Sequence, residues 1–153
     1  MKKLGSILRL DFVPASVDAG LLVLRLWTGL SLLLLHGWTK LSTFQQMASK
    51  FPDPLGVGHR TSLTLALVGE VLCPILLVLG LFTRFGALGA AINMSVAFFL
   101  VHKGKLTGQG SGEMAFIYLA SFVVLLVAGP GKFALDGSSG KSSAPKKPKP
   151  AKD

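Results

Sequence analysis

Cysteine is nearly absent from this chain: Cys73 is the single one among 153 residues, and no CxxC pair exists. One thiol cannot form an internal disulfide, and it leaves a metal site without a set of soft ligands. The three histidines show no HxxxH or HExxH spacing, so the sequence predicts no metal site. Cys73 lies inside an apolar run, where a small packing role is the simplest interpretation.

Catalytic and nucleotide-binding motifs are missing as well. The chain has no phosphate-cradling glycine loop, no dinucleotide fingerprint and no Ser–His–Asp spacing, so motifs alone do not identify an enzyme. Acidic residues are few, 7 against 16 Lys and Arg, for a net charge of +9. These cations flank apolar segments and crowd into the tail, which argues against nucleic acid as a partner and favours anionic lipid.

What the sequence has in abundance is apolar residues, which make up half of the chain at a mean hydropathy of +0.59. A soluble domain of this size cannot cover so much apolar surface. Helical spans need about 17–25 apolar residues. We therefore expect an all-α, polytopic membrane four-helix bundle in residues 17–136, embedded in a lipid bilayer. Its spans are predicted at about 19–38, 61–81, 85–101 and 114–129.

Loop cations predict the orientation of the bundle. Ten Lys and Arg fall on the side of the two termini and five on the other, so both ends are expected in the cytoplasm (N-in/C-in). Residues 1–16 are expected to form a cytoplasmic interfacial segment. Residues 137–153, rich in Gly, Ser, Lys and Pro, are expected to be a disordered basic tail.

Two ionisable residues, Arg25 and Glu70, interrupt the first two apolar runs. An arginine at such depth costs about 3 kcal/mol by insertion scales. The simplest solution is that the two side chains form an ion pair. Pro74 removes a donor and clashes four residues back, so the backbone carbonyl of Glu70 should be freed, and Arg25 is expected to bridge both the carboxylate and this carbonyl.

Further polar positions complete the candidate site. His36 follows Arg25 by eleven residues, about three helical turns, which places both on one face of the first span. In the third span Gly86, Ala90 and Asn93 share a face. The two small residues are interpreted as a close-packing stripe, and Asn93 is either a polar contact between helices or part of the site.

Two loop features extend this picture. Glu113 opens the fourth span, where it serves either the helix N-terminus or the site. The segment FQQMASKF at residues 44–51 spaces its apolar side chains at i, i+3, i+4 and i+7, which predicts an amphipathic helix at the membrane surface.

The order of these segments is more informative than any one of them. It resembles the DoxX family of small four-helix bacterial membrane proteins over about residues 20–136, through the segments RLWTGLSLLLLHGWTKL, GEVLCPILLVLGLFTR, GEMAFIYL and GPGKFALD. The resemblance implies a multi-pass protein of the bacterial inner membrane. The family is named for a subunit of a thiosulfate:quinone oxidoreductase, and its relatives resemble membrane partners in redox and oxidative-stress complexes.

From the resemblance and the buried polar residues we expect a quinone-linked redox accessory subunit or membrane anchor of an oxidoreductase complex. Quinone is the expected cofactor, electrons come from a protein partner, and a homodimer is compatible with the sequence. At most the chain is a subunit of an enzyme. The candidate site residues are Arg25, His36, Glu70, Asn93 and Glu113, and the structural ones Pro74, Gly86 and Ala90. A non-catalytic scaffold and a small proton-coupled carrier remain alternatives.

Overall fold

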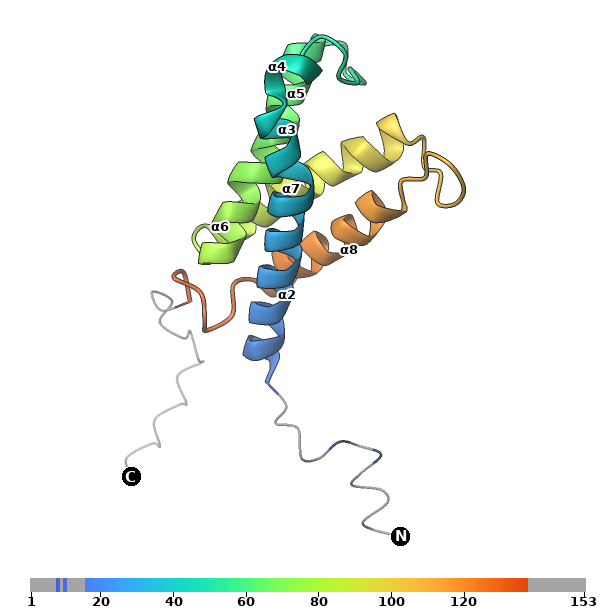
Figure 1. Cartoon of the computed structure of the whole chain (residues 1–153). Coiled ribbons are helices and arrows are strands. Elements are labelled where there is room, and N and C mark those ends of the chain that lie inside the picture. The colour runs from blue at the N-terminus through green and yellow to red at the C-terminus, as the bar shows by residue number, and fades with distance from the viewer. Residues whose placement is uncertain (1–7, 9, 11–15, 138–153) are drawn as a thin grey trace, which may run out of the picture.

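The computed structural model describes residues 8, 10 and 16–137, and within them the chain is helical with no strand. Figure 1 shows two long upright rods, built from α2 to α3 and from α5 to α6, with α7 and α8 slanting across them. The elements are α2 (Val17–Leu32), η1 (Leu33–Gly37), α3 (Trp38–Ser42), α4 (Phe44–Met47), α5 (His59–Leu67), η2 (Val68–Leu72), α6 (Cys73–Leu79), α7 (Thr83–Ser95), η3 (Val96–Val101) and α8 (Glu113–Ala128).

The first helix runs continuously from Val17 to Ser42 through a π-helical stretch, η1. Ser16 caps its start by accepting a hydrogen bond from the backbone N–H of Ala19 (3.1 Å), which satisfies one of the donors left free at a helix N-terminus. The helix passes the end of its apolar run without interruption, because no Gly or Pro stop follows Trp38 at once. Lys40 therefore belongs to this helix and not to a loop.

The second helix, His59–Leu79, contains the π-helical stretch η2, in which the N–H of Cys73 donates to the carbonyl of Val68 five residues back. Pro74 lies in the first turn of α6, directly after this stretch. A π turn beside a proline is a known way to keep a helix continuous where one backbone donor is missing. Gly80, in a left-handed conformation (φ 70°), then ends α6.

The third helix, α7, packs against both α6 and the fourth helix, α8. Gly86 brings α7 onto α6, since a Cβ there would lie 3.1 Å from the carbonyl oxygen of Cys73. Ala90 is fully buried, together with Phe122 and Leu125 of α8. Small residues at such a crossing let the backbones approach closely.

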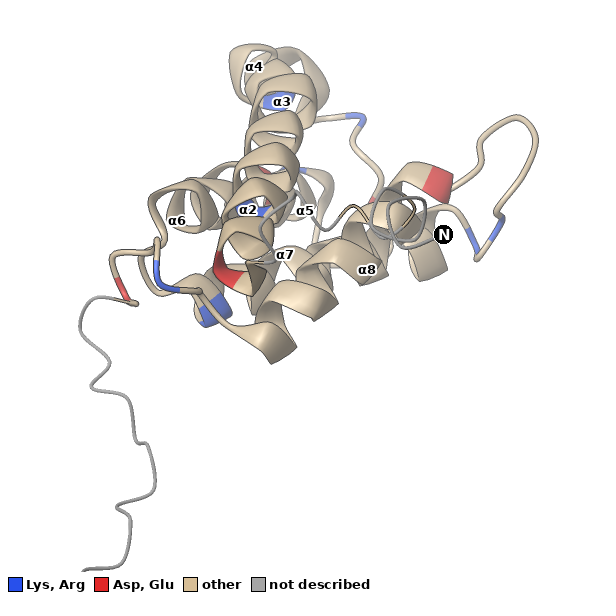
Figure 2. Cartoon of the chain, turned by 90° about the horizontal axis from the view of Figure 1, so that it is seen from below, with Lys and Arg blue, Asp and Glu red and all other residues tan. Residues whose placement is uncertain are grey.

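Three helices are long and apolar enough to cross a membrane: Val17–Ser42, His59–Leu79 and Thr83–Val101. The fourth, α8, is apolar but has only 16 residues. Many large apolar side chains are exposed along these helices, and Figure 2 shows the charged residues mainly at helix ends and in loops. The chain is a multi-pass membrane protein; a fourth span and the N-in/C-in orientation stay predictions.

The segment predicted as an amphipathic helix at 44–51 forms a single helical turn, α4, followed by turns. Its apolar side chains are nevertheless half-buried and its polar ones exposed, as the spacing predicts. The predicted interfacial segment, apart from residues 8, 10 and 16, and the tail after residue 137 lie outside the described residues.

Candidate functional site

A cavity of about 280 Å³ lies between the second and third helices, beneath the loop that joins α4 to α5. Its walls come from α5 and η2 on one side and from α7 and η3 on the other. Phe51, Pro54 and Leu55 of the loop cover it. Almost all of the lining is aliphatic or aromatic, which is typical of small-molecule sites.

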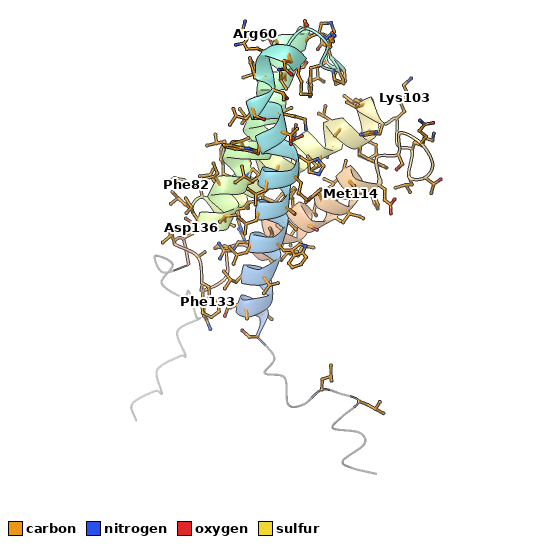
Figure 3. The ribbon with its side chains drawn as sticks, in the orientation of Figure 1. Arg60, Phe82, Lys103, Met114, Phe133 and Asp136 are labelled. Atoms are coloured by element: carbon orange, nitrogen blue, oxygen red, sulfur yellow. The ribbon has the colours of Figure 1, made fainter. Side chains whose placement is uncertain are left out.

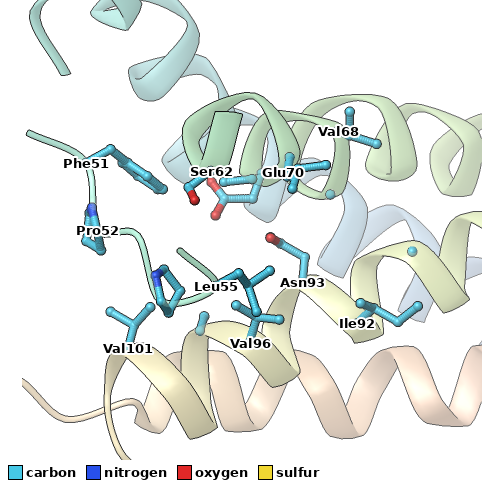
Figure 4. Close-up of a pocket in the computed structure, with 16 residues that line it drawn as sticks. Phe51, Pro52, Leu55, Ser62, Val68, Glu70, Ile92, Asn93, Val96 and Val101 are labelled. Carbon is cyan, nitrogen blue, oxygen red and sulfur yellow. The ribbon is translucent and has the colours of Figure 1, made fainter. Parts of the chain in front are cut away.

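Polar groups lie on both walls of this cavity. Glu70 of η2 has only 6% of its surface exposed, and Ser62 of α5 lies beside it. From the facing helix Asn93 is directed into the same space (Figure 4). Its Nδ2 is buried and has no hydrogen-bond partner among the described residues. This nitrogen thus does not form the expected polar contact between helices. It packs against Gly69, which has no side chain to accept a hydrogen bond.

The partner of Glu70 is Lys40, whose Nζ forms a salt bridge with Oε2 of the carboxylate. The lysine side chain is mostly buried. A buried carboxylate at membrane depth requires such a partner. Lys40 was not predicted as a site residue, because its position after the apolar run placed it among the loop cations. The signal that was available is its i, i+4 spacing from His36, which continues the helix beyond the apolar run.

The predicted Arg25–Glu70 pair is wrong. Arg25 is completely buried and donates to two backbone carbonyls, those of Leu77 (3.2 Å) and Phe133 (3.1 Å). The first acceptor lies in the last turn of α6, where free carbonyls favour a cation. The second belongs to the segment after α8. Arg25 thus joins three parts of the chain at one end of the bundle, and it does not reach the carbonyl of Glu70.

Helix register explains why the two charges stay apart. The first two helices run antiparallel, and Gly29 lies against the carbonyl of Pro74 while Gly37 lies against that of Glu70. Glu70 therefore lies at the level of Gly37, which follows Arg25 by twelve residues, or about 18 Å along the first helix. Close packing at the two glycines sets this register, and the charges find separate partners within it.

The surroundings of Arg25 form a compact polar cluster. The backbone of Gly80 leaves room for its guanidinium, where a Cβ would collide with Nη1. Asp136 accepts hydrogen bonds from the N–H groups of Phe82 (3.0 Å) and Thr83 (2.7 Å) at the start of α7. These bonds, more than the nearby Arg25, hold the pKa of Asp136 below its usual value. Figure 3 shows Phe82, Phe133 and Asp136 together at this end, with Arg60 at the other.

Two other candidates lie outside the cavity. The ring of His36 meets that of Tyr118 edge to face (centroids 5.9 Å apart), and the Tyr118 hydroxyl donates to Ser31 Oγ (2.9 Å). His36 therefore faces α8. Glu113 is exposed at the start of α8, after the N-cap residue Gly112. The structure brings together Glu70 and Asn93 of the predicted site and adds Lys40. His36 lies outside the cavity but within electrostatic reach of Glu70 and Lys40, and Arg25 and Glu113 lie elsewhere.

The loop over the cavity is held by Asp53. Its carboxylate accepts hydrogen bonds from Ser62 Oγ (2.6 Å) and from the N–H groups of Val57 (3.0 Å) and Gly58 (2.8 Å). The bond from Ser62 is the main reason why the pKa of Asp53 lies below its usual value. His59 Nδ1 lies 2.6 Å from the carbonyl oxygen of Phe51. Both ends of the loop are thus tied to the start of α5.

The chemistry available in the cavity is hydrogen bonding and proton transfer. The Asn93 amide can donate to a carbonyl oxygen, and Glu70 can accept or release a proton while Lys40 supplies the compensating charge. Within the described residues, no three His, Cys, Asp or Glu side chains are grouped to hold a metal ion.

Comparison with known proteins agrees with this architecture. The model of the DoxX family matches residues 20–103, more than half of the chain. Two proteins of Haemophilus influenzae, both described as uncharacterized, are similar to it. One is 30% identical over 105 residues, 67% of this chain and 70% of the relative. The other is 34% identical over 108 residues, 67% of this chain and 78% of the relative. No solved structure matches.

Proposed function

The chain belongs to the DoxX family of membrane proteins, and we propose that it is a quinone-binding subunit of an oxidoreductase complex in the bacterial inner membrane. The observation that carries the proposal is the cavity between the second and third helices. It combines an apolar lining with the Glu70 carboxylate, which is paired with Lys40 outside the lining, and with an amide at Asn93 whose Nδ2 has no partner among the described residues.

A quinone head group fits this combination of surfaces. Its ring is apolar and requires a dry, aliphatic or aromatic wall. Its carbonyl oxygens are acceptors. The Asn93 side chain lies across the cavity from Glu70 with its amide oxygen toward it (Figure 4), and turning the amide group brings Nδ2, which now packs against Gly69, into the cavity as a donor. A buried donor without a partner costs about 1–3 kcal/mol, so a ligand that accepts from Nδ2 is stabilised by removing this cost.

The protein's contribution to the reaction is binding and proton supply. Reduction of a quinone to a quinol consumes two electrons and two protons. In this proposal the electrons come from a partner protein. Glu70 delivers one proton to the quinone oxygen that it faces and is reprotonated by the Lys40 ammonium, which regains its proton from water at its exposed edge. The second proton reaches the other quinone oxygen from outside this pair. Asn93 holds the ring in place.

Quinone binding tests the proposal directly. The chain purified in a mild detergent is titrated with decylubiquinone, and quinones that co-purify are extracted and identified. Asn93→Leu removes the amide while keeping the side-chain size, and it should weaken binding about tenfold, the worth of one buried hydrogen bond. Glu70→Gln should retain binding but slow reduction of the quinone by the partner complex.

Glu113→Gln is the matched control, because Glu113 is a carboxylate of the same chain that is exposed and outside the cavity. This variant should bind and support reduction like the natural protein. Equal affinity of the natural protein and the Asn93→Leu variant would contradict the proposal, provided that both melt at similar temperatures.

A further inference from the structure

We infer that the cavity is loaded sideways from the bilayer, through a mouth between the second and third helices, and that its ligand is an amphiphile whose long apolar tail stays in the lipid. The identity of the head group rests on the proposed function; the route of entry and the need for a tail do not. The mouth is formed by Leu65 and Val68 on one helix and Ile92 on the other.

The position of these three side chains carries the inference. Each lines the cavity and is also exposed, Val68 with 44% and Ile92 with 57% of its surface. All three lie within helices of membrane-spanning length and composition. An exposed apolar side chain on such a helix faces acyl chains. The cavity therefore opens where the surrounding solvent is hydrocarbon.

The opposite end of the cavity is covered by the loop between α4 and α5, in which Pro52 and Leu55 line the cavity and are exposed. Phe51 and Pro54 lie over it, half-buried, and the loop that carries them is fixed by the hydrogen bonds of Asp53 to Ser62, Val57 and Gly58. A water-soluble ligand would have to pass this fixed loop. A lipid-soluble one has only to pass between the aliphatic side chains of the mouth.

Volume and polarity then define the ligand. At about 280 Å³ the cavity is at the lower limit of small-molecule sites, enough for a single ring but not for a ring with a long chain. The polar groups, Glu70 and Asn93, line the interior, whereas the mouth is aliphatic. A polar head enters and binds at the Glu70 wall, and the tail trails out past Val68 and Ile92 into the membrane.

Cysteine accessibility tests the route without reference to any quinone. Ala66, buried on the cavity wall, is changed to Cys in a Cys73→Ala background. The protein is placed in vesicles and treated with a maleimide that carries a ten-carbon tail or with a sulfonated, water-soluble maleimide on both sides. Sideways entry predicts that the tailed reagent labels Cys at position 66 at least tenfold faster than the sulfonated one.

A matched pair of variants identifies the mouth. Val68→Trp narrows it, whereas Val123→Trp places the same bulk on α8 at a valine of equal exposure, 44%, outside the cavity lining. The first should slow labelling by the tailed maleimide about tenfold and the second should leave it unchanged. Faster labelling by the sulfonated reagent, labelling by neither reagent, or equal effects of the two tryptophans would overturn the inference.

A second comparison separates the route from the nature of the head group. Decylubiquinone and a tailless benzoquinone are titrated against the natural protein and both tryptophan variants. Loss of the tailed ligand alone in Val68→Trp supports entry and tail placement through the mouth. If neither quinone binds the natural protein while the maleimide pattern holds, the proposed function fails and the sideways route stands.

Discussion

Gly37 of the first helix lies directly against the backbone carbonyl of Glu70 in the second, so close that any Cβ at this position would overlap the oxygen. Both residues belong to π-helical stretches, η1 and η2. This contact sets the height at which Lys40, one turn further along, meets the Glu70 carboxylate. The backbone approach of two helices thus positions the ion pair of the cavity.

Gly37→Ala should therefore separate the two helices and weaken the Lys40–Glu70 contact. We expect the free energy of unfolding to fall by about 1–3 kcal/mol, the usual cost of overpacking, measured by thermal unfolding in detergent. Gly20→Ala is the control in the same helix, since a Cβ at Gly20 meets nothing within 4 Å; it should be neutral or stabilising by up to about 1 kcal/mol through helix propensity. Equal melting temperatures would contradict the packing role of Gly37.

A double-mutant cycle distinguishes the observed partners from the predicted ones. Arg25→Met should cost about 2–4 kcal/mol, because two hydrogen bonds from a charged donor are lost, one of them to the buried carbonyl of Leu77. Combined with Glu70→Gln it should be additive within about 0.5 kcal/mol, since the two residues share no contact.

In the same assay, Lys40→Met and Glu70→Gln should be coupled by about 1 kcal/mol or more, because each single change leaves its partner's buried charge without compensation. Coupling between positions 25 and 70, with none between 40 and 70, would restore the pairing that the sequence suggested.

Gly80→Ala tests the polar cluster around Arg25. Gly80 has a φ of 70° and its missing Cβ leaves room for the guanidinium. Gly56 is a matched control, with a φ of 67° and nothing within 4 Å of a built Cβ. Both substitutions incur backbone strain of about 1 kcal/mol. Only Gly80→Ala should also displace Arg25, so its melting temperature should fall well below that of Gly56→Ala; similar values would show that Arg25 moves aside at no cost.

Acid should weaken the same end of the bundle through Asp136. Hydrogen bonds from Thr83 and Phe82 hold its pKa below the ordinary 3.8 when the chain is folded. Its stabilising contribution is complete above that pH and is lost as the pH falls through the lower, folded value. Asp136→Asn should lower the melting temperature at pH 7 and flatten its fall between about pH 5 and 2. A curve parallel to that of the natural protein would show that Asp136 does not contribute.

Composition was enough to predict where the helices lie. The predicted runs fall on the observed helices to within a few residues, except that the first extends to Ser42. Because the predicted run ended at residue 38, Lys40 was assigned to a loop. Glu70 and Asn93 were both selected as buried polar residues, and they do face one cavity. Rarity of polar groups in apolar helices is a property of sequence, so such residues can be found without a structure.

Which helix faces which neighbour could not be read in the same way. The eleven-residue spacing placed Arg25 and His36 on one stripe, assuming 3.6 residues per turn throughout. The π-helical stretch η1 adds a residue to the turn that contains His36, so the phase changes and His36 faces Tyr118 while Arg25 faces the end of α6. No local sequence pattern predicts a π turn. The register of the two helices depends on glycine contacts between segments far apart in the chain.

The hydrogen bonds of Arg25 also impose an order on the assembly of the molecule. One acceptor, the carbonyl of Leu77, lies 52 residues after Arg25 in the sequence, and the other, that of Phe133, lies 108 residues after it. During synthesis the first helix emerges from the ribosome long before Phe133 exists, and domains form from the N-terminal end first. The guanidinium therefore lacks its second acceptor until residue 133 has been translated, and a truncation before that residue leaves it with the carbonyl of Leu77 alone.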